Sequence, residues 1–104
     1  FGIHAGAIET SMMLAVAPEQ VDMAQARDFA SSAEWRAQHC PILGNGRSAK
    51  LAWQMQDYNP AGAVGNAASA RADTGRLLID ATGRALAQLL AEVHALPADT
   101  VRTA

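Results

Sequence analysis

A long amphipathic helix near the carboxyl end constrains the fold of this 104-residue chain more than any other feature. Apolar residues recur at three- and four-residue spacing from about Ala67 or Ser69 to Leu96. Pro97 ends the pattern, because proline cannot continue a helix. The helix needs a cover for its apolar face, so we expect it to pack on other elements and to self-associate where it is uncovered. The stripe is wider than a coiled-coil seam and comprises Leu78, Ile79, Ala81, Ala85, Leu86, Leu89, Leu90, Val93 and Leu96.

Two glycines, Gly75 and Gly83, fall inside this predicted helix. Each costs about 1 kcal/mol relative to alanine in a helix interior. We therefore expect both glycines to mark places where the backbone of a neighbouring element comes close. The segment 97–104 follows the proline and is predicted to be a frayed tail.

A second, shorter helix is predicted over residues 7–17. Ile8, Met12 and Val16 recur at helical spacing there, and Pro18 stops the run. This apolar face is typical of a packed core rather than of a ligand site. The chain therefore has two main helices, one near each end.

The stretch between the two helices is irregular. Ser31 and Ser32 are predicted to cap a short helical turn that runs to His39. The segment 41–48 is rich in glycine and proline and predicts a loop, whereas 51–55 alternates and predicts a short strand. Long irregular connections are uncommon in a self-contained domain, so we expect this chain to pack on a larger body.

Composition limits the classes of function. Half of the residues are apolar, 17% are charged and the net charge is −2, with no run of lysine or arginine. We therefore expect neither a nucleic-acid nor a membrane partner. Cys40 is the only cysteine, so no intramolecular disulfide can form and a reducing cytoplasm is the expected location.

His4 and Glu9 are the first candidates for chemistry. Histidine titrates near neutral pH and suits proton transfer, although a histidine this close to a chain start is more often structural or solvated. Glu9 is predicted in the first helical turn, where a carboxylate compensates free backbone N–H groups. The alternative interpretation is that Glu9 orients His4.

Other polar residues give weaker signals. Trp53, Gln56 and Asp57 lie in a polar, aromatic segment flanked by turns, which fits a substrate pocket and a strand end equally well. His39 and Cys40 are adjacent, but neighbouring side chains seldom bind one ion, and no second pair stands at zinc-site spacing. We therefore expect no metal site in this chain.

Two segments resemble the creatininase (creatinine amidohydrolase) family, and together the likeness runs over residues 1–96. The first segment reads His4-Ala-Gly-x-x-Glu9-Thr10-Ser11-x-Met13-Leu14-Ala15, followed by Pro18-Glu19-x-Val21-Asp22-Met23. The second reads Trp53-x-x-Gln56-Asp57-x-Asn59-Pro60-x-Gly62-x-x-Gly65-Asn66-Ala67, with Ala70 and Gly75 beyond it.

The resemblance implies an α/β fold with three layers, α/β/α. Residues 1–104 would form the C-terminal portion of one such domain, mostly helical with one or two short strands. Intact members of the family are longer, metal-dependent amidohydrolases that use zinc or manganese. Their ligands come from a Glu-x-His pair, a bridging Asp and a Gly-His-x-Glu motif, and none of these matches a residue here.

The same resemblance assigns roles to two residues. His4 matches the family's active-site histidine, implied to assist proton transfer at the scissile amide, and Glu9 matches the acid of that motif in a supporting role. In creatininase itself a glutamate precedes the histidine, where this chain has Ile3. The implied substrate is therefore a small amide, either creatinine-like and cyclic or formamide-like.

The implied partners are the remainder of the polypeptide and further copies in a homo-oligomer. A chain without metal ligands is expected to be inactive alone. The alternative is a non-catalytic helical module for packing or oligomerisation.

Overall fold

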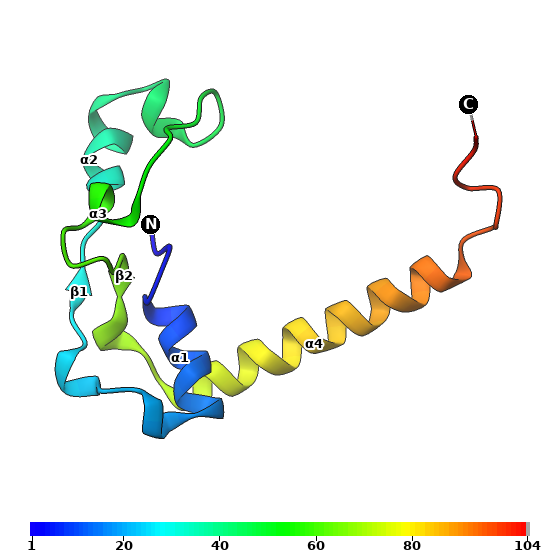
Figure 1. The fold of residues 1–104 in the computed structure, drawn as a ribbon, viewed down its shortest axis with the longest axis horizontal. Coiled ribbons are helices and arrows are strands. Elements are labelled where there is room, and N and C mark those ends of the chain that lie inside the picture. Colours follow the sequence, from blue (N-terminus) through cyan, green and yellow to red (C-terminus); the bar gives the residue numbers. More distant parts are fainter. Residues whose placement is uncertain (104) are drawn as a thin grey trace.

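Two helices that lie far apart in the sequence cross near the centre of the molecule. The computed structural model describes residues 1–103, and Figure 1 shows α1 against the first turns of α4. The helices are α1 (Ala7–Val16), α2 (Ser32–His39), α3 (Met55–Tyr58) and α4 (Ala72–Ala95), and the strands are β1 (Asp28–Phe29) and β2 (Gly65–Asn66). Short 3-10 turns lie at Pro18–Gln20, Met23–Gln25, Leu43–Asn45 and Ala67–Ser69.

The crossing of α1 and α4 depends on Gly75. A Cβ atom at this position would lie 1.8 Å from the carbonyl oxygen of Ser11, so only glycine allows the two backbones to approach this closely. The Ser11 side chain is 1% exposed, and its Oγ accepts a hydrogen bond of 3.0 Å from the backbone N–H of Arg71. The close approach predicted at Gly75 is confirmed.

Two expectations for α4 are wrong. The helix begins at Ala72 rather than at residues 67–69, because the Asn66 side chain accepts from Ser69 N–H and closes a separate 3-10 turn. Arg71 then has an extended backbone. A Cβ atom at Gly83 would meet nothing within 4 Å, so no backbone of another element approaches this glycine among the described residues.

The strands form a small antiparallel ladder. β1 pairs with β2 in the register Asp28–Asn66 and Phe29–Gly65, and an isolated bridge joins His4 to Val64. The strand predicted over residues 51–55 is wrong, because residues 51–54 are irregular and Met55 begins α3. The carboxylate of Asp57 accepts a hydrogen bond of 2.7 Å from Gln54 N–H, which favours a helical turn there.

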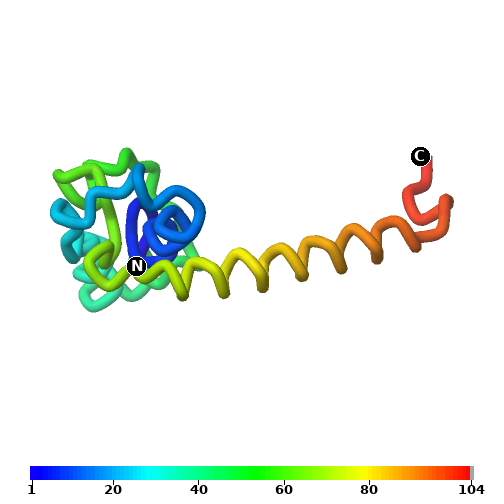
Figure 2. Tube along the Cα trace, turned by 90° about the horizontal axis from the view of Figure 1, so that it is seen from below, coloured from blue at the N-terminus to red at the C-terminus, as the bar shows by residue number. Residues whose placement is uncertain are grey.

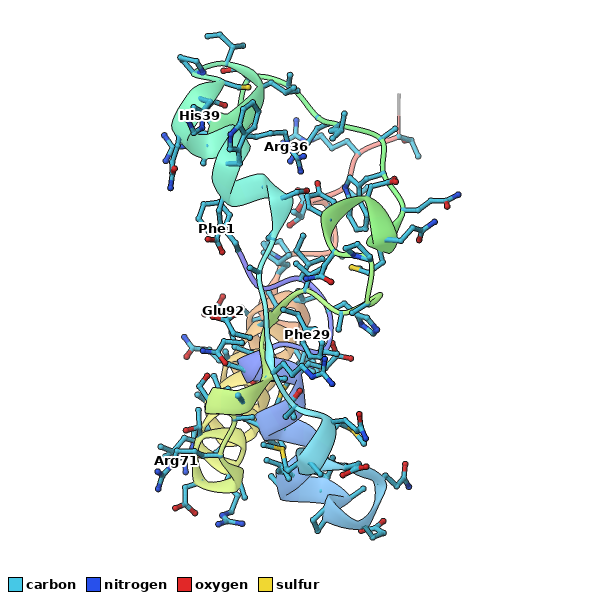
Figure 3. All side chains as sticks on the ribbon, turned by 90° about the vertical axis from the view of Figure 1, so that its left-hand side faces the viewer. Phe1, Phe29, Arg36, His39, Arg71 and Glu92 are labelled. Atoms are coloured by element: carbon cyan, nitrogen blue, oxygen red, sulfur yellow. The ribbon has the colours of Figure 1, made fainter. Side chains whose placement is uncertain are left out.

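The region of α2 and α3 lies away from the α1–α4 crossing (Figures 1 and 3). Ser31 caps α2 as predicted, since its Oγ accepts from Ala33 N–H at 3.1 Å. Ser32 Oγ donates to the carbonyl of Asp57 and ties α2 to α3. Arg36 lies over the ring of Tyr58, with 5.0 Å between its Cζ atom and the ring centroid.

The buried core is small. Val64 and Ala67 are its buried apolar residues among those described, and they lie beside the strand ladder. Beyond its first turns α4 projects away from the rest of the chain, as Figures 1 and 2 show. None of the described helices combines the length and the apolar character that a bilayer crossing requires.

Candidate functional site

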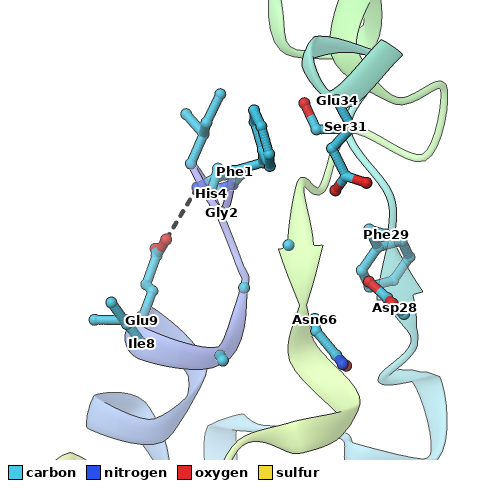
Figure 4. A pocket seen from close by; sticks show the side chains of 14 residues that line it. Phe1, Gly2, His4, Ile8, Glu9, Asp28, Phe29, Ser31, Glu34 and Asn66 are labelled. Carbon is cyan, nitrogen blue, oxygen red and sulfur yellow. Dashed lines mark ion pairs between the residues drawn. The ribbon is translucent and has the colours of Figure 1, made fainter. Parts of the chain in front are cut away.

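An open cavity of about 640 Å³ lies between the amino-terminal segment, the start of α1 and the strand ladder (Figure 4). Both of the first predicted site residues, His4 and Glu9, line it. The remaining lining residues are Phe1, Gly2, Ile3, Gly6, Ala7, Ile8, Asp28, Phe29, Ser31, Glu34, Gly65 and Asn66.

Backbone pairing fixes the position of His4. The N–H of Val64 donates to the carbonyl of His4 at 2.8 Å, and the N–H of Ile3 donates to the carbonyl of Val64 at 2.9 Å. Val64 is fully buried, so the segment that carries His4 is held to the best-packed residue of the chain. The His4 side chain is 52% exposed and therefore accessible to a ligand.

One oxygen of Glu9 contacts two groups. Oε2 accepts a hydrogen bond of 2.8 Å from the backbone N–H of Ala5 and lies 3.3 Å from His4 Nδ1 (Figure 4). Ala5 has a φ of +52°, a left-handed conformation that is unusual for a residue with a Cβ. Because Nδ1 faces the carboxylate, Nε2 is the ring nitrogen of His4 that remains for a substrate.

Glycines bring the histidine segment against β2. Gly65 has a φ of +133°, and a Cβ there would lie 2.9 Å from the Cα of Gly6. A Cβ at Gly6 would in turn lie 3.1 Å from the Cα of Gly65. This backbone-to-backbone contact sets the width of the cavity next to His4.

The cavity is lined by both apolar and acidic side chains. Ile3, Phe1 and Phe29 supply apolar surface, whereas Asp28 and Glu34 supply carboxylates. This arrangement offers proton transfer at the histidine and hydrogen-bond acceptors around a small ligand. Within residues 1–103, no three His, Cys, Asp or Glu side chains are grouped so that they could hold a metal ion.

The structure places the other predicted pocket residues elsewhere. Trp53, Gln56 and Asp57 lie in or just before α3 and line neither this cavity nor the second cavity, of about 310 Å³, on the other side of Glu9. Asp57 binds Gln54 N–H, and Trp53 packs edge-on against Tyr58 with 4.9 Å between ring centroids. Their role in binding a substrate stays a prediction.

Sequence reasoning missed part of the cavity wall. Asp28, Phe29 and Glu34 come from β1 and α2, and no local pattern marks them as site residues. Gly65 and Asn66 did carry a signal, because they stand in the second segment that resembles the family. Their place opposite His4 follows from the β1–β2 pairing, which the sequence did not predict.

Comparison with known proteins identifies the family of the chain. The family model "Creatininase: Creatinine amidohydrolase" matches residues 1–90, the segment that contains the cavity and most of α4. The chain belongs to the creatininase family. No curated protein matches it significantly.

One solved structure supports the fold assignment. The chain is similar to the "Putative creatinine amidohydrolase" of Bacteroides fragilis, with a TM-score of 0.69 and 26% sequence identity. The match covers 93% of this chain but 36% of that protein. The chain therefore corresponds to about a third of a creatininase-like α/β fold, and its mostly helical content with one small ladder agrees with such a part.

Proposed function

We propose that this chain supplies the histidine wall of an amidohydrolase active site that cleaves the C–N bond of a small, non-peptide amide. The observation that carries the proposal is the His4–Glu9 pair, with 3.3 Å between His4 Nδ1 and Glu9 Oε2, at the edge of an open cavity. Membership of the creatininase family supports the reaction class.

His4 is the proposed proton donor to the leaving nitrogen. Amide cleavage needs this proton because the nitrogen leaves poorly as an anion but readily as a neutral amine, and histidine as a residue type can donate a proton near neutral pH. Glu9 is proposed as a positioning residue. Its carboxylate holds the ring through Nδ1, which directs Nε2 to the substrate.

The metal expected from the resemblance, zinc or manganese, does not fit the residues of this chain. The described part contains no grouped set of ligands, so no catalytic step here is assigned to a metal. We propose that any metal centre of the complete enzyme is held by polypeptide outside residues 1–103, and that the chain alone does not turn over an amide.

The proposed substrate class is based on the side chains that line the cavity. Ile3 stands beside His4 where creatininase has a glutamate, and it lines the cavity together with Phe1 and Phe29. A partly apolar pocket suits a compact cyclic or formyl amide. A cytoplasmic location is proposed with it, on the ground that the single cysteine, Cys40, does not call for an oxidising compartment.

The test is a substitution at His4 in the complete metal-loaded enzyme that contains this chain. His4→Ala is expected to lower kcat by about 10²–10⁴-fold with creatinine or a formamide as substrate, because the general acid is lost. Glu9→Gln keeps the side-chain shape and is expected to lower kcat less, because the imidazole of His4 remains but loses the carboxylate that orients it through Nδ1.

Glu19→Gln serves as the matched control, since Glu19 is an exposed acid beyond the end of α1. It is expected to leave both constants unchanged. An unaltered kcat in His4→Ala, measured with metal bound, would contradict the proposed role of His4.

A non-catalytic packing module is the second candidate function. The observation that favours it is the uncovered apolar face of α4, of which Leu86, Leu89 and Leu90 are more than half exposed. It predicts that no amide is hydrolysed even when the complete protein carries its metal.

A further inference from the structure

The cavity at His4 has two sides, which different backbone contacts hold in place. One side is the histidine segment, residues 1–9. The other side, here called the β1 wall, consists of Asp28, Phe29, Ser31 and Glu34. The chain at β2 lies between them and bonds to both, as Figure 4 shows. The spacing of the two sides therefore depends on where this chain leaves one side for the other.

The change of partner occurs at Val64, just before β2. The ladder with β1 reaches the pair Phe29–Gly65, and the same register would bring Val64 opposite Ala30. The N–H of Val64 instead donates to the carbonyl of His4 at 2.8 Å. The described ladder with β1 ends before Ala30, so strand pairing does not fix the β1 wall at this point.

The side chain of Asn59 bonds to the β1 wall where the ladder ends. Its Nδ2 donates a hydrogen bond of 3.0 Å to the carbonyl of Ala30, in the middle of the β1 wall. Its Oδ1 accepts a hydrogen bond of 2.9 Å from Ala61 N–H and closes the turn that leads to Val64. One amide group thus joins the β1 wall to the turn before the residue that holds His4.

The fold as a whole does not depend on this link. Ser32 Oγ donates to the carbonyl of Asp57 at 2.9 Å, and Arg36 lies over the ring of Tyr58, so α2 and α3 stay joined without Asn59. Asn59 lines neither cavity. It is therefore placed to set the position of a backbone segment rather than to contact a ligand or to hold the elements together.

We propose that Asn59 is a positioning residue that sets the spacing between the β1 wall and His4, and thereby the affinity of the site for its substrate. The inference rests on the proposed function, because it takes the cavity as the substrate site. His4 is held by Val64 and Glu9 on the opposite side. A shift of the β1 wall therefore changes what the substrate contacts and leaves proton transfer in place.

Asn59→Asp separates the two contacts of the side chain in the complete metal-loaded enzyme that contains this chain. The carboxylate still accepts from Ala61 N–H, but it has no proton to donate to the carbonyl of Ala30. KM for creatinine or a formamide is expected to rise at least about ten-fold, with kcat within about two-fold of its original value. Asn59→Ala also loses the turn before Val64, so it is expected to lower kcat as well.

Asn45→Asp is the matched control. Asn45 makes the same kind of turn, since its Oδ1 accepts from Arg47 N–H at 2.8 Å. Its Nδ2 donates to Ser48 Oγ, and this hydroxyl can donate to a carboxylate in return. None of these three residues lines the cavity. Asn45→Asp is expected to leave KM and kcat unchanged.

Hydrogen exchange in the complete enzyme gives a readout that needs no substrate. Asn59→Asp is expected to speed the exchange of backbone amides in residues 28–34, because the β1 wall loses a hydrogen bond. Exchange in residues 3–10 is expected to stay the same, since the contacts of Val64 and Glu9 remain. Asn45→Asp should change neither segment.

Two results would overturn the inference. One is an unchanged KM in Asn59→Asp, and the other is an equal loss of activity in Asn59→Asp and Asn45→Asp, which would mean a general effect on folding. A complete enzyme that hydrolyses no amide would contradict the proposed function separately. Exchange in residues 28–34 then decides on Asn59 alone: faster exchange in Asn59→Asp supports the positioning role, and unchanged exchange excludes it.

Discussion

At the scale of single residues, the site depends on one carboxylate oxygen. Glu9 Oε2 accepts from Ala5 N–H at 2.8 Å and faces His4 Nδ1 at 3.3 Å. The same contact therefore holds the ring and the left-handed turn of the backbone that carries it. A glutamate in the first turn of α1 thus determines which ring nitrogen of His4 is left for a substrate.

Ala5 provides a prediction at this scale. Its φ of +52° costs about 1–2 kcal/mol for an L-residue, whereas glycine adopts it freely and loses about 0.4–1 kcal/mol through unfolded-state entropy. We expect Ala5→Gly to leave the free energy of unfolding unchanged or to raise it by up to about 1.6 kcal/mol. Ala5→Val, with a β-branched side chain, is expected to lower it. Thermal denaturation measures both, and a clear loss of stability in Ala5→Gly would contradict the argument.

At the scale of elements, the placement of α4 rests on a contact between backbones. Gly75 lies against the carbonyl of Ser11, and Ser11 Oγ accepts from Arg71 N–H just before the helix begins. The hydroxyl of Ser11 therefore joins residues that are sixty positions apart. Together with the turn that Asn66 closes through Ser69 N–H, this contact determines where α4 begins.

The two glycines of α4 give a matched pair of variants. Gly75→Ala places a methyl group 1.8 Å from a backbone oxygen, so we expect a loss of about 3 kcal/mol in the free energy of unfolding. Gly83→Ala meets nothing within 4 Å and is expected to gain about 1 kcal/mol from helix propensity. Urea unfolding of dilute protein measures both values. Equal effects of the two substitutions would contradict this account of the crossing.

At the scale of the whole molecule, stability is unevenly distributed. The contact between α1 and the first turns of α4 is packed, whereas the rest of α4 has no cover in the described chain. The extents of 51 × 39 × 19 Å reflect this projecting helix. The chain therefore has one packed region and one helical segment that no described element covers.

Hydrogen exchange is expected to show this division. In dilute solution, amides of residues 79–95 should exchange faster than those of residues 75–78, the first that are hydrogen-bonded within α4, because local opening is cheapest where few contacts form. Uniform exchange along α4 would contradict the unequal packing.

Local and periodic patterns were enough to predict the main helices, the cap at Ser31, the close approach at Gly75 and the family. Each of these features depends on a short run of neighbouring residues, so it can be recognised without knowledge of distant contacts. The strand expected over residues 51–55 does not form, because the hydrogen bond from Gln54 N–H to Asp57 stabilises the first turn of α3 more than the alternating pattern favours a strand. Resemblance to the family, rather than spacing, singled out His4 and Glu9.

Contacts between distant segments determined the rest. The pairing of β1 with β2 and of His4 with Val64 joins segments separated by tens of residues, and it brings Asp28 and Asn66 into the wall of the cavity that the histidine segment also lines. No local pattern encodes which two-residue strands will pair, because such short strands have almost no intrinsic preference. Likewise, the apolar face of α4 is evident in the sequence along its whole length, but only packing determines that α1 covers its beginning and leaves the part from Ile79 onward exposed among the described residues.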